Sequence, residues 1–233
     1  MLLERIFLLK IVQDKGLPAL VGFNLRYHCL YKKIKEIIAS NKLGRIFSFQ
    51  AETDQYLLEW RDFDYTKSYS AYKELGGGVI FDLTHEIDLA VDLLGQVNWL
   101  TCFKDKTSSL KINTKDIAEI TFSHKNGGIS HIHLDYLQKE YTRKFKSIFE
   151  KGEVFWDYSL DKIKLINENK SSELFQPESY TRDDTFKSQF KHWFNVLEQK
   201  EKPLIPLEDG IYISKVAIST HKSSDQKKWI KVG

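Results

Sequence analysis

The sequence predicts an α+β domain in which helices cover one face of a mostly antiparallel sheet. Strand-like segments crowd the second half of the chain, at residues 97–104, 117–124, 129–137, 144–149, 153–158, 162–168 and 229–232. Asn126-Gly127-Gly128 joins two of them and is a hairpin signal, because Asn and Gly tolerate positive φ. Helix-like segments are fewer, at residues 29–40, 79–94, 184–199 and 207–221.

Composition excludes several classes of protein. The 233 residues carry 35 basic and 32 acidic side chains, a net charge of +3 without a basic cluster, so we expect no nucleic-acid partner. No apolar run approaches the roughly 20 residues of a membrane span. Cys29 and Cys102 form neither a disulfide framework nor a zinc set, which favours a cytoplasmic protein.

The N-terminal segment MLLERIFLLKIV (1–12) could be a signal peptide or a helix. Glu4 and Lys10 interrupt its apolar run and no small-residue cleavage site follows, so a helix that ends before Gly16 is favoured. The next segment, LPALVGF (17–23), is almost continuously apolar and is typical of a strand buried on both faces. A helix followed by such a strand indicates the end of an α/β unit.

The first half of the remaining chain contains one strand and one irregular stretch. Residues 45–56 alternate as a strand, whereas residues 57–74 combine aromatic and charged side chains without a period. A loop of this length is more often functional than a plain connector. Gly76-Gly77-Gly78 then precedes the helix predicted over 79–94 and is either a flexible loop or a place where a ligand approaches the backbone.

The helix after the glycines carries the main candidate for chemistry. Asp82, His85 and Asp88 recur every third residue, which places them along one helix face. A histidine flanked by carboxylates suits general acid/base catalysis near neutral pH. The alternatives are a solvated charged face and a histidine at the edge of the core that Asp88 satisfies.

Two further sets of residues are candidate ligand contacts. Asn24 and Arg26 follow the segment predicted as a buried strand, and ligands gather at the carboxyl ends of such strands; Arg26 could equally tie two segments together. His131 and His133 alternate on a strand and could bind a metal. No third ligand is evident nearby, and Asp135 extends the polar side of the strand, so we predict no metal.

Four stretches of the chain resemble one known family. They are VGFNLRYH (21–28), KLGRIFSFQAE (42–52), SYSAYKELGGGVIFDLTHEIDLAVDLLG (68–95) and PLIPLEDGIYISKVAISTHKSSDQKKWIKV (203–232). With these segments the sequence resembles the glucose-fructose oxidoreductase / inositol dehydrogenase / MocA (Gfo/Idh/MocA) family of NAD(P)-dependent oxidoreductases. The resemblance implies an open, largely antiparallel mixed sheet in a C-terminal domain that follows a Rossmann domain.

The resemblance also implies roles for individual residues. His85 would be the acid/base group, and Asp82 would orient it. The spacing of three residues between Asp82 and His85 is shorter than the spacing of four in many members of the family. Asp88 is therefore a competing candidate for the residue that orients His85. Asn24 and Arg26 would lie near the nicotinamide. The residues that would line the sugar pocket are Tyr56, Trp60, Tyr69, Lys73 and Asp88.

The main departure from the family is in the cofactor domain. No G-x-G-x-x-G occurs, so residues 1–23 are expected to be the last helix and strand of a dinucleotide-binding domain, and residues 24–233 the substrate-binding, catalytic and dimerisation domain. We expect the family's NAD or NADP not to bind this shortened chain alone, which would then be inactive.

The function implied is that of the C-terminal half of an oxidoreductase acting on a sugar, cyclitol or nucleotide-sugar. A homodimer or higher homo-oligomer would form through the sheet. The alternative is a non-catalytic sugar-binding or dimerisation module derived from the same fold.

Overall fold

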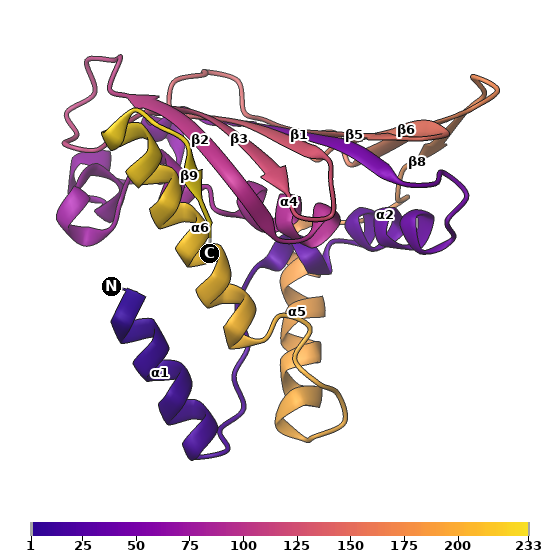
Figure 1. Ribbon diagram of the computed structural model, residues 1–233, viewed down its shortest axis with the longest axis horizontal. Helices are drawn as coiled ribbons and strands as arrows, with labels where there is room; N and C mark the ends of the chain where they lie inside the picture. The colour runs from indigo at the N-terminus through magenta and orange to yellow at the C-terminus, as the bar shows by residue number, and fades with distance from the viewer. Residues whose placement is uncertain (1, 233) are drawn as a thin grey trace.

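The computed structural model describes residues 2–232, which build one mixed sheet with helices on one side (Figure 1). The nine strands are ordered β8-β7-β6-β5-β1-β4-β3-β2-β9. All neighbouring pairs are antiparallel except β1 and β4, which run parallel in the middle of the sheet. This confirms the predicted α+β class with an open, largely antiparallel sheet.

The strands follow the predicted segments closely, with one addition. Their bounds are β1 Ile46–Asp54, β2 Val97–Asp105, β3 Ile117–His124, β4 Ile129–Asp135, β5 Thr142–Phe149, β6 Gly152–Asp157, β7 Lys162–Asn167, β8 Ser172–Phe175 and β9 Ile230–Lys231. The added strand, β8, is mostly exposed, and its sequence SELF lacks the apolar alternation that marks the others.

The helices lie beneath the sheet in Figure 1, and the indigo α1 runs beside the yellow α6. Their bounds are α1 Leu2–Asp14, α2 Cys29–Ala39, α3 Val79–Asp82, α4 His85–Leu94, α5 Arg182–Leu197 and α6 Leu207–Gln226. Helix α6 packs on β2, and α4 packs on β1 and β4. Local signals set the ends of two of them: a capping box of Thr181 and Asp184 starts α5, and Gly95 at φ 82° ends α4.

The alternation of side chains divides the sheet into a covered face and a bare face. Phe49, Ile120 and Ile132 project toward the helices and are at most 1% exposed. Their strand neighbours Gln50, Glu119 and His131 project to the opposite face, where no described helix packs (Figure 1). The covered face therefore supplies the core, and the bare face of the sheet stays in contact with solvent.

Residues 17–23 do not form the predicted strand. The segment is extended but pairs with no strand, because it runs along α6 rather than along an edge of the sheet. The amide of Val21 donates to the carbonyl of Ile205 at 2.9 Å. A Cβ on Gly210 of α6 would lie 2.4 Å from Val21 Cγ2, so the glycine allows this close approach.

The helix predicted over 79–94 is divided. Leu83 leaves the helical conformation at φ −109°, ψ 42°, so that α3 ends at Asp82 and α4 starts at His85. This break changes the geometry of the candidate site, since Asp82 and His85 no longer share one helix face. None of the helices within residues 2–232 is long and apolar enough to cross a membrane.

Candidate active site

A cavity of about 460 Å³ opens on the covered side of the sheet, where α3 meets α4. It brings together four of the residues predicted from the sequence, Asn24, Trp60, Asp82 and His85. Residues that the prediction missed complete the lining: Gln55, Arg61, Leu83, Tyr141, Arg143, Tyr158 and Arg182. The site is thus built from the segment after Phe23, the aromatic stretch, the α3–α4 break and the ends of β5 and β6.

His85 is the candidate acid/base group in this cavity. Phe23 packs edge-on against its ring, with ring centroids 5.7 Å apart. Burial, together with the charge of Arg143, lowers the pKa of His85 to about 3, so the imidazole is neutral near pH 7. Its Nδ1 is buried and has no hydrogen-bond partner among the described residues. Because the imidazole is neutral and lines the cavity, it has a lone pair that can accept a proton from a ligand bound there.

Asp82 lines the same cavity but does not hydrogen-bond His85. Its Oδ2 accepts a hydrogen bond from the hydroxyl of Tyr136 at 2.7 Å. Burial raises the pKa of Asp82 above its ordinary value, while hydrogen bonds, among them that of Tyr136, act in the opposite direction. Because the helix breaks between them, Asp82 and His85 act on the cavity as separate groups.

Arg26 and Asp88 are brought together outside the cavity. The guanidinium donates to both carboxylate oxygens of Asp88, at 2.9 and 2.6 Å, and to Asp92 at 3.0 Å. Asp88 is completely buried and Arg26 is 9% exposed. This ion pair ties the segment after Phe23 to α4, which is the structural role that the sequence left open for Arg26, and Asp88 is not a partner of His85.

The other residues predicted for the sugar pocket lie near its rim or away from it. Tyr69 contacts the guanidinium of Arg61, whose Cζ is 5.3 Å from the ring centroid. Tyr56 carries the ammonium of Lys139 over its ring. Lys73 is exposed and its amide donates to Asn113 Oδ1 at 2.7 Å. None of these three lines the cavity.

Arg143 and Glu86 form the ion pair beside His85 that sequence analysis missed. Nε of Arg143 lies 2.9 Å from Oε1 of Glu86, which also accepts from the hydroxyl of Thr53 at 2.7 Å. Glu86 is fully buried. In the register of β1 and β5, Thr53 lies opposite Arg143, which brings the arginine to the covered face. No local sequence signal identifies this contact, because it depends on strand pairing.

The middle glycine of the triplet shapes the aromatic stretch. A Cβ on Gly77 would lie 2.2 Å from the carbonyl oxygen of Tyr69, a distance that no side chain tolerates. Gly77 therefore lets the residues 69–71 approach the start of α3. This geometry corresponds to neither interpretation of the triplet: Gly77 allows the backbone of residues 69–71, not a ligand, to approach closely.

The glycine triplet is not placed as it would be in a dinucleotide-binding site. Such a site needs a glycine-rich turn between a buried strand and a helix, where the backbone amides bind the pyrophosphate. The glycine triplet follows the 3₁₀ turn Lys73–Leu75, not a strand, and leads into the four-residue helix α3. Arg26, one of the two residues expected near the nicotinamide, is fully engaged with Asp88 and Asp92.

Solved structures with the same fold are oxidoreductases. An oxidoreductase from Agrobacterium radiobacter in complex with NAD+, L-tartaric acid and magnesium matches with a TM-score of 0.85 and 18% identity, over 100% of this chain and 70% of that one. Levoglucosan dehydrogenase in complex with NADH matches with a TM-score of 0.89 and 16% identity, again over 100% of this chain and 70% of that one. At these identities the likeness shows the fold.

Sequence comparisons show the family. YteT of Bacillus subtilis (strain 168), whose name places it among the oxidoreductases, is 34% identical over 77 residues, which cover 33% of this chain and only 18% of that protein. The family model for the GFO/IDH/MocA C-terminal domain matches residues 31–155, more than half of the chain. This match confirms the resemblance found in the sequence: the chain belongs to the GFO/IDH/MocA family and carries its C-terminal domain.

Proposed function

We propose that this chain supplies the substrate-binding half of an NAD(P)-dependent oxidoreductase that acts on a hydroxyl or keto group of a sugar, cyclitol or nucleotide-sugar. The observation that carries the proposal is the neutral His85 in the wall of a cavity of about 460 Å³. The family match and the names of the structural neighbours, one of them a levoglucosan dehydrogenase, support it.

The chemistry assigned to His85 is proton transfer. When a substrate alcohol is oxidised, its hydroxyl proton would go to the neutral imidazole and the hydride on its carbon to the NAD(P)⁺ held by a dinucleotide-binding domain. In the reverse reaction the imidazolium would return the proton to the carbonyl oxygen. Asp82, held by Tyr136, would hydrogen-bond a neighbouring hydroxyl rather than orient His85. Trp60 would place an aromatic ring against the sugar face.

The charges of the cavity favour an acidic substrate. Its lining contains three arginines, Arg61, Arg143 and Arg182, and a single carboxylate, that of Asp82. Glu86 neutralises Arg143, which leaves Arg61 and Arg182 available for a carboxylate or phosphate of the ligand. We therefore expect a sugar acid or phosphorylated sugar to bind more tightly than the neutral sugar of the same size. The Agrobacterium relative bound to L-tartaric acid agrees with this preference.

The division of labour within the enzyme is part of the proposal. Residues 24–233 would form the substrate-binding domain, and residues 1–23 would belong to the dinucleotide-binding domain, whose glycine fingerprint this sequence lacks. The chain alone would then bind no dinucleotide tightly and transfer no hydride. It would work in the cytoplasm, and copies would associate through the bare face of the sheet, where Trp99, Phe103 and Ile129 are 41%, 69% and 55% exposed.

Ligand titration with a fluorescence readout tests the cavity. Sugar acids and their neutral counterparts are added while tryptophan emission is followed, with Trp60→Phe to identify the reporting residue. Arg61→Met is expected to weaken binding of the acids about tenfold, equivalent to one charge-assisted hydrogen bond of roughly 1.5 kcal/mol, and to leave neutral sugars unchanged. Arg45→Met is the matched control, because Arg45 also lies over an aromatic ring, that of Phe47, outside the cavity.

Two results would contradict the proposal. NMR of the histidine side chains, with His85→Gln for assignment, should show the His85 resonances moving as a sugar acid saturates the cavity; unmoved resonances would exclude His85 from the site. Energy transfer from tryptophan to NADH should show no saturation at micromolar cofactor, and saturation would contradict the division between the two domains. Sugar binding that is unaffected in His85→Gln would favour the non-catalytic binding module.

A further inference from the structure

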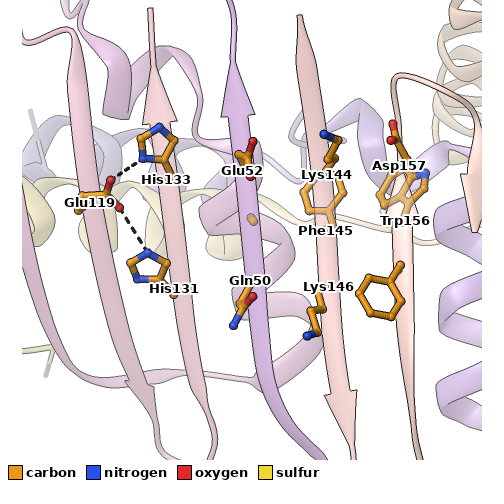
Figure 2. A pocket seen from close by; sticks show the side chains of 12 residues that line it. Gln50, Glu52, Glu119, His131, His133, Lys144, Phe145, Lys146, Trp156 and Asp157 are labelled. Atoms are coloured by element: carbon orange, nitrogen blue, oxygen red, sulfur yellow. Dashed lines mark hydrogen bonds and ion pairs between the residues drawn. The ribbon is translucent and has the colours of Figure 1, made fainter. Parts of the chain in front are cut away.

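A second cluster of chemically active side chains lies on the bare face, away from the proposed catalytic cavity. Strands β1 and β4 are the parallel pair, and Asp54 and Asp135 are opposite one another where the two strands end. His133 of β4 lies on the same face, next to Glu119 of β3, as Figure 2 shows. Sequence spacing did not reveal this cluster, because Asp54 comes from a strand distant in the sequence.

The distances between the side-chain atoms of this cluster match the ligand-to-ligand distances of a metal site. Nε2 of His133 lies 3.3 Å from Oδ1 of Asp54 and 3.4 Å from Oδ2 of Asp135. The three atoms are all within 4.8 Å of one another. In a tetrahedral zinc site with bonds of about 2.0–2.1 Å, neighbouring ligand atoms are about 3.3–3.4 Å apart. The two distances from His133 Nε2 to the aspartates already have this value. The distance between the two aspartate oxygens reaches it after a small movement of one carboxylate.

Each of the three side chains is held by a second contact that leaves one ligand atom free. Nδ1 of His133 lies 2.5 Å from Oε1 of Glu119, which directs Nε2 toward the two aspartates. Oδ1 of Asp135 accepts from the amides of Leu137 and Gln138, at 2.7 and 2.9 Å, so Oδ2 remains. A carboxylate on the far nitrogen of a histidine is the usual outer contact of a metal ligand.

Asp54 supplies a second, independent observation that favours a cation at this cluster. Its side chain is 1% exposed, and its Oδ2 accepts from the hydroxyl of Thr142 at 2.8 Å. Its Oδ1 is buried without a hydrogen-bond partner among the described residues and points at His133 Nε2. A buried carboxylate oxygen with no hydrogen bond, only an ion-pair contact at 3.3 Å, costs free energy that a bound cation would recover.

We propose that Asp54, His133 and Asp135 bind a divalent transition-metal ion, for which Zn²⁺ is the probe. One imidazole nitrogen and two carboxylate oxygens suit zinc and leave a fourth position open to water. The ion would join the ends of β1 and β4 to the connection that carries Gln138 and Thr142. The site lies on the opposite face of the sheet from His85, so it does not depend on the function proposed for that cavity.

The test is zinc binding to the intact chain, measured by calorimetry and by equilibrium dialysis with metal analysis. We expect one Zn²⁺ per chain at micromolar or lower Kd, not displaced by millimolar Mg²⁺. His133→Ala and Asp54→Asn should each weaken binding at least 100-fold, and Glu119→Gln about 10- to 100-fold. The matched control is His131→Ala: Nε2 of His131 also lies 3.3 Å from Glu119, but His131 is not one of the three residues whose ligand atoms lie within 4.8 Å of one another.

Thermal unfolding separates loss of the site from loss of the fold. Zinc at 100 times its Kd should raise the Tm of the wild type by about 5–10 °C and leave the Tm of His133→Ala unchanged, while the two proteins show the same circular dichroism in EDTA. Absence of zinc binding below about 100 μM overturns the proposal, with the cluster then a metal-free network of ion pairs. Equal loss of affinity in His131→Ala and His133→Ala overturns it as well.

Discussion

The two faces of the sheet place similar side chains in opposite environments. On the covered face, burial lowers the pKa of His85 to about 3, and the neutral ring has no carboxylate partner. On the bare face, a hydrogen bond that His133 donates to Asp135 raises the pKa of His133 to about 9, and carboxylates surround the ring. These two histidines therefore differ in protonation state because the ring of His85 is buried, whereas carboxylates surround the ring of His133.

The largest expected effect comes from a charge pair of the covered face. Arg26→Ala leaves Asp88 of α4 buried without its guanidinium partner, and we expect a loss of about 3–5 kcal/mol in the free energy of unfolding. Urea unfolding followed by circular dichroism measures it. The low exposure of the pair, 9% and 0%, makes solvent an inadequate substitute for the lost guanidinium.

A double variant sharpens this prediction. In Arg26→Met with Asp88→Leu both charges are replaced by apolar side chains, so the uncompensated carboxylate disappears, and stability should recover by at least half of the loss. Burial raises the pKa of Asp88 to about 6 even though Arg26 lies beside it. The contact with Arg26 therefore does not fully offset the cost of burying the carboxylate. A double variant less stable than Arg26→Ala would show that the ion pair is needed for more than charge balance.

A smaller effect is expected from the pH dependence of His85. Its pKa in the unfolded chain is near the ordinary 6.5 and in the folded chain about 3, so below pH 6.5 the unfolded state takes up a proton that the folded state does not. The contribution of His85 to stability therefore falls as the pH drops. Between pH 7 and pH 5 the difference in unfolding free energy between wild type and His85→Gln should change by about 1–2 kcal/mol in favour of the variant.

Because the pH test is a difference between two proteins, the other titrating groups cancel. Urea unfolding at pH 7, 6 and 5 supplies the data, and the effect is specific to the environment of His85 beside Phe23 and Arg143. A difference that stays constant with pH would mean that His85 is as easily protonated as an exposed histidine. The pKa of His85 would then not be lowered by its position on the covered face, and the contrast with His133 would be lost.

Features set by local sequence could be predicted. The hairpin at Asn126-Gly127-Gly128, the alternating strand β1 and the capped helix α5 each depend on residues close together in the chain, and the structure has all three. The alternation also placed His131 and His133 on one face. His85 could be selected because the pattern of charges around it is local, and the structure places it in the cavity.

Features set by pairing between distant segments could not be predicted. Whether the helix over 79–94 continues past Leu83 depends on how the two halves pack beneath the sheet. The contact of Arg143 with Glu86 depends on the register of β5 against β1, and the approach of Asp54 to His133 depends on the parallel pairing of β1 with β4. The segment 17–23 has a strand's composition, but it packs on α6 instead of a strand.

The smallest expected effect comes from an ion pair of the bare face. Lys146 Nζ lies 3.8 Å from Glu153 Oε2, and the two side chains are 36% and 40% exposed. Water screens such a pair, so Lys146→Ala should change the unfolding free energy by no more than about 1 kcal/mol, and 1 M salt should abolish the difference from wild type. Urea unfolding at low and high salt, with Arg26→Ala measured beside it, compares the two faces directly.

Lys146→Ala also tests whether copies of the chain associate through the bare face. If copies of the chain associate through this face, Lys146 becomes buried at high protein concentration. The loss in unfolding free energy caused by Lys146→Ala should then increase with protein concentration. The loss caused by Arg26→Ala should stay the same. Unfolding at two protein concentrations a hundredfold apart distinguishes the cases. A cost above about 2 kcal/mol at the lower concentration contradicts the description of this face as solvated, because only a desolvated charge is that expensive to unpair.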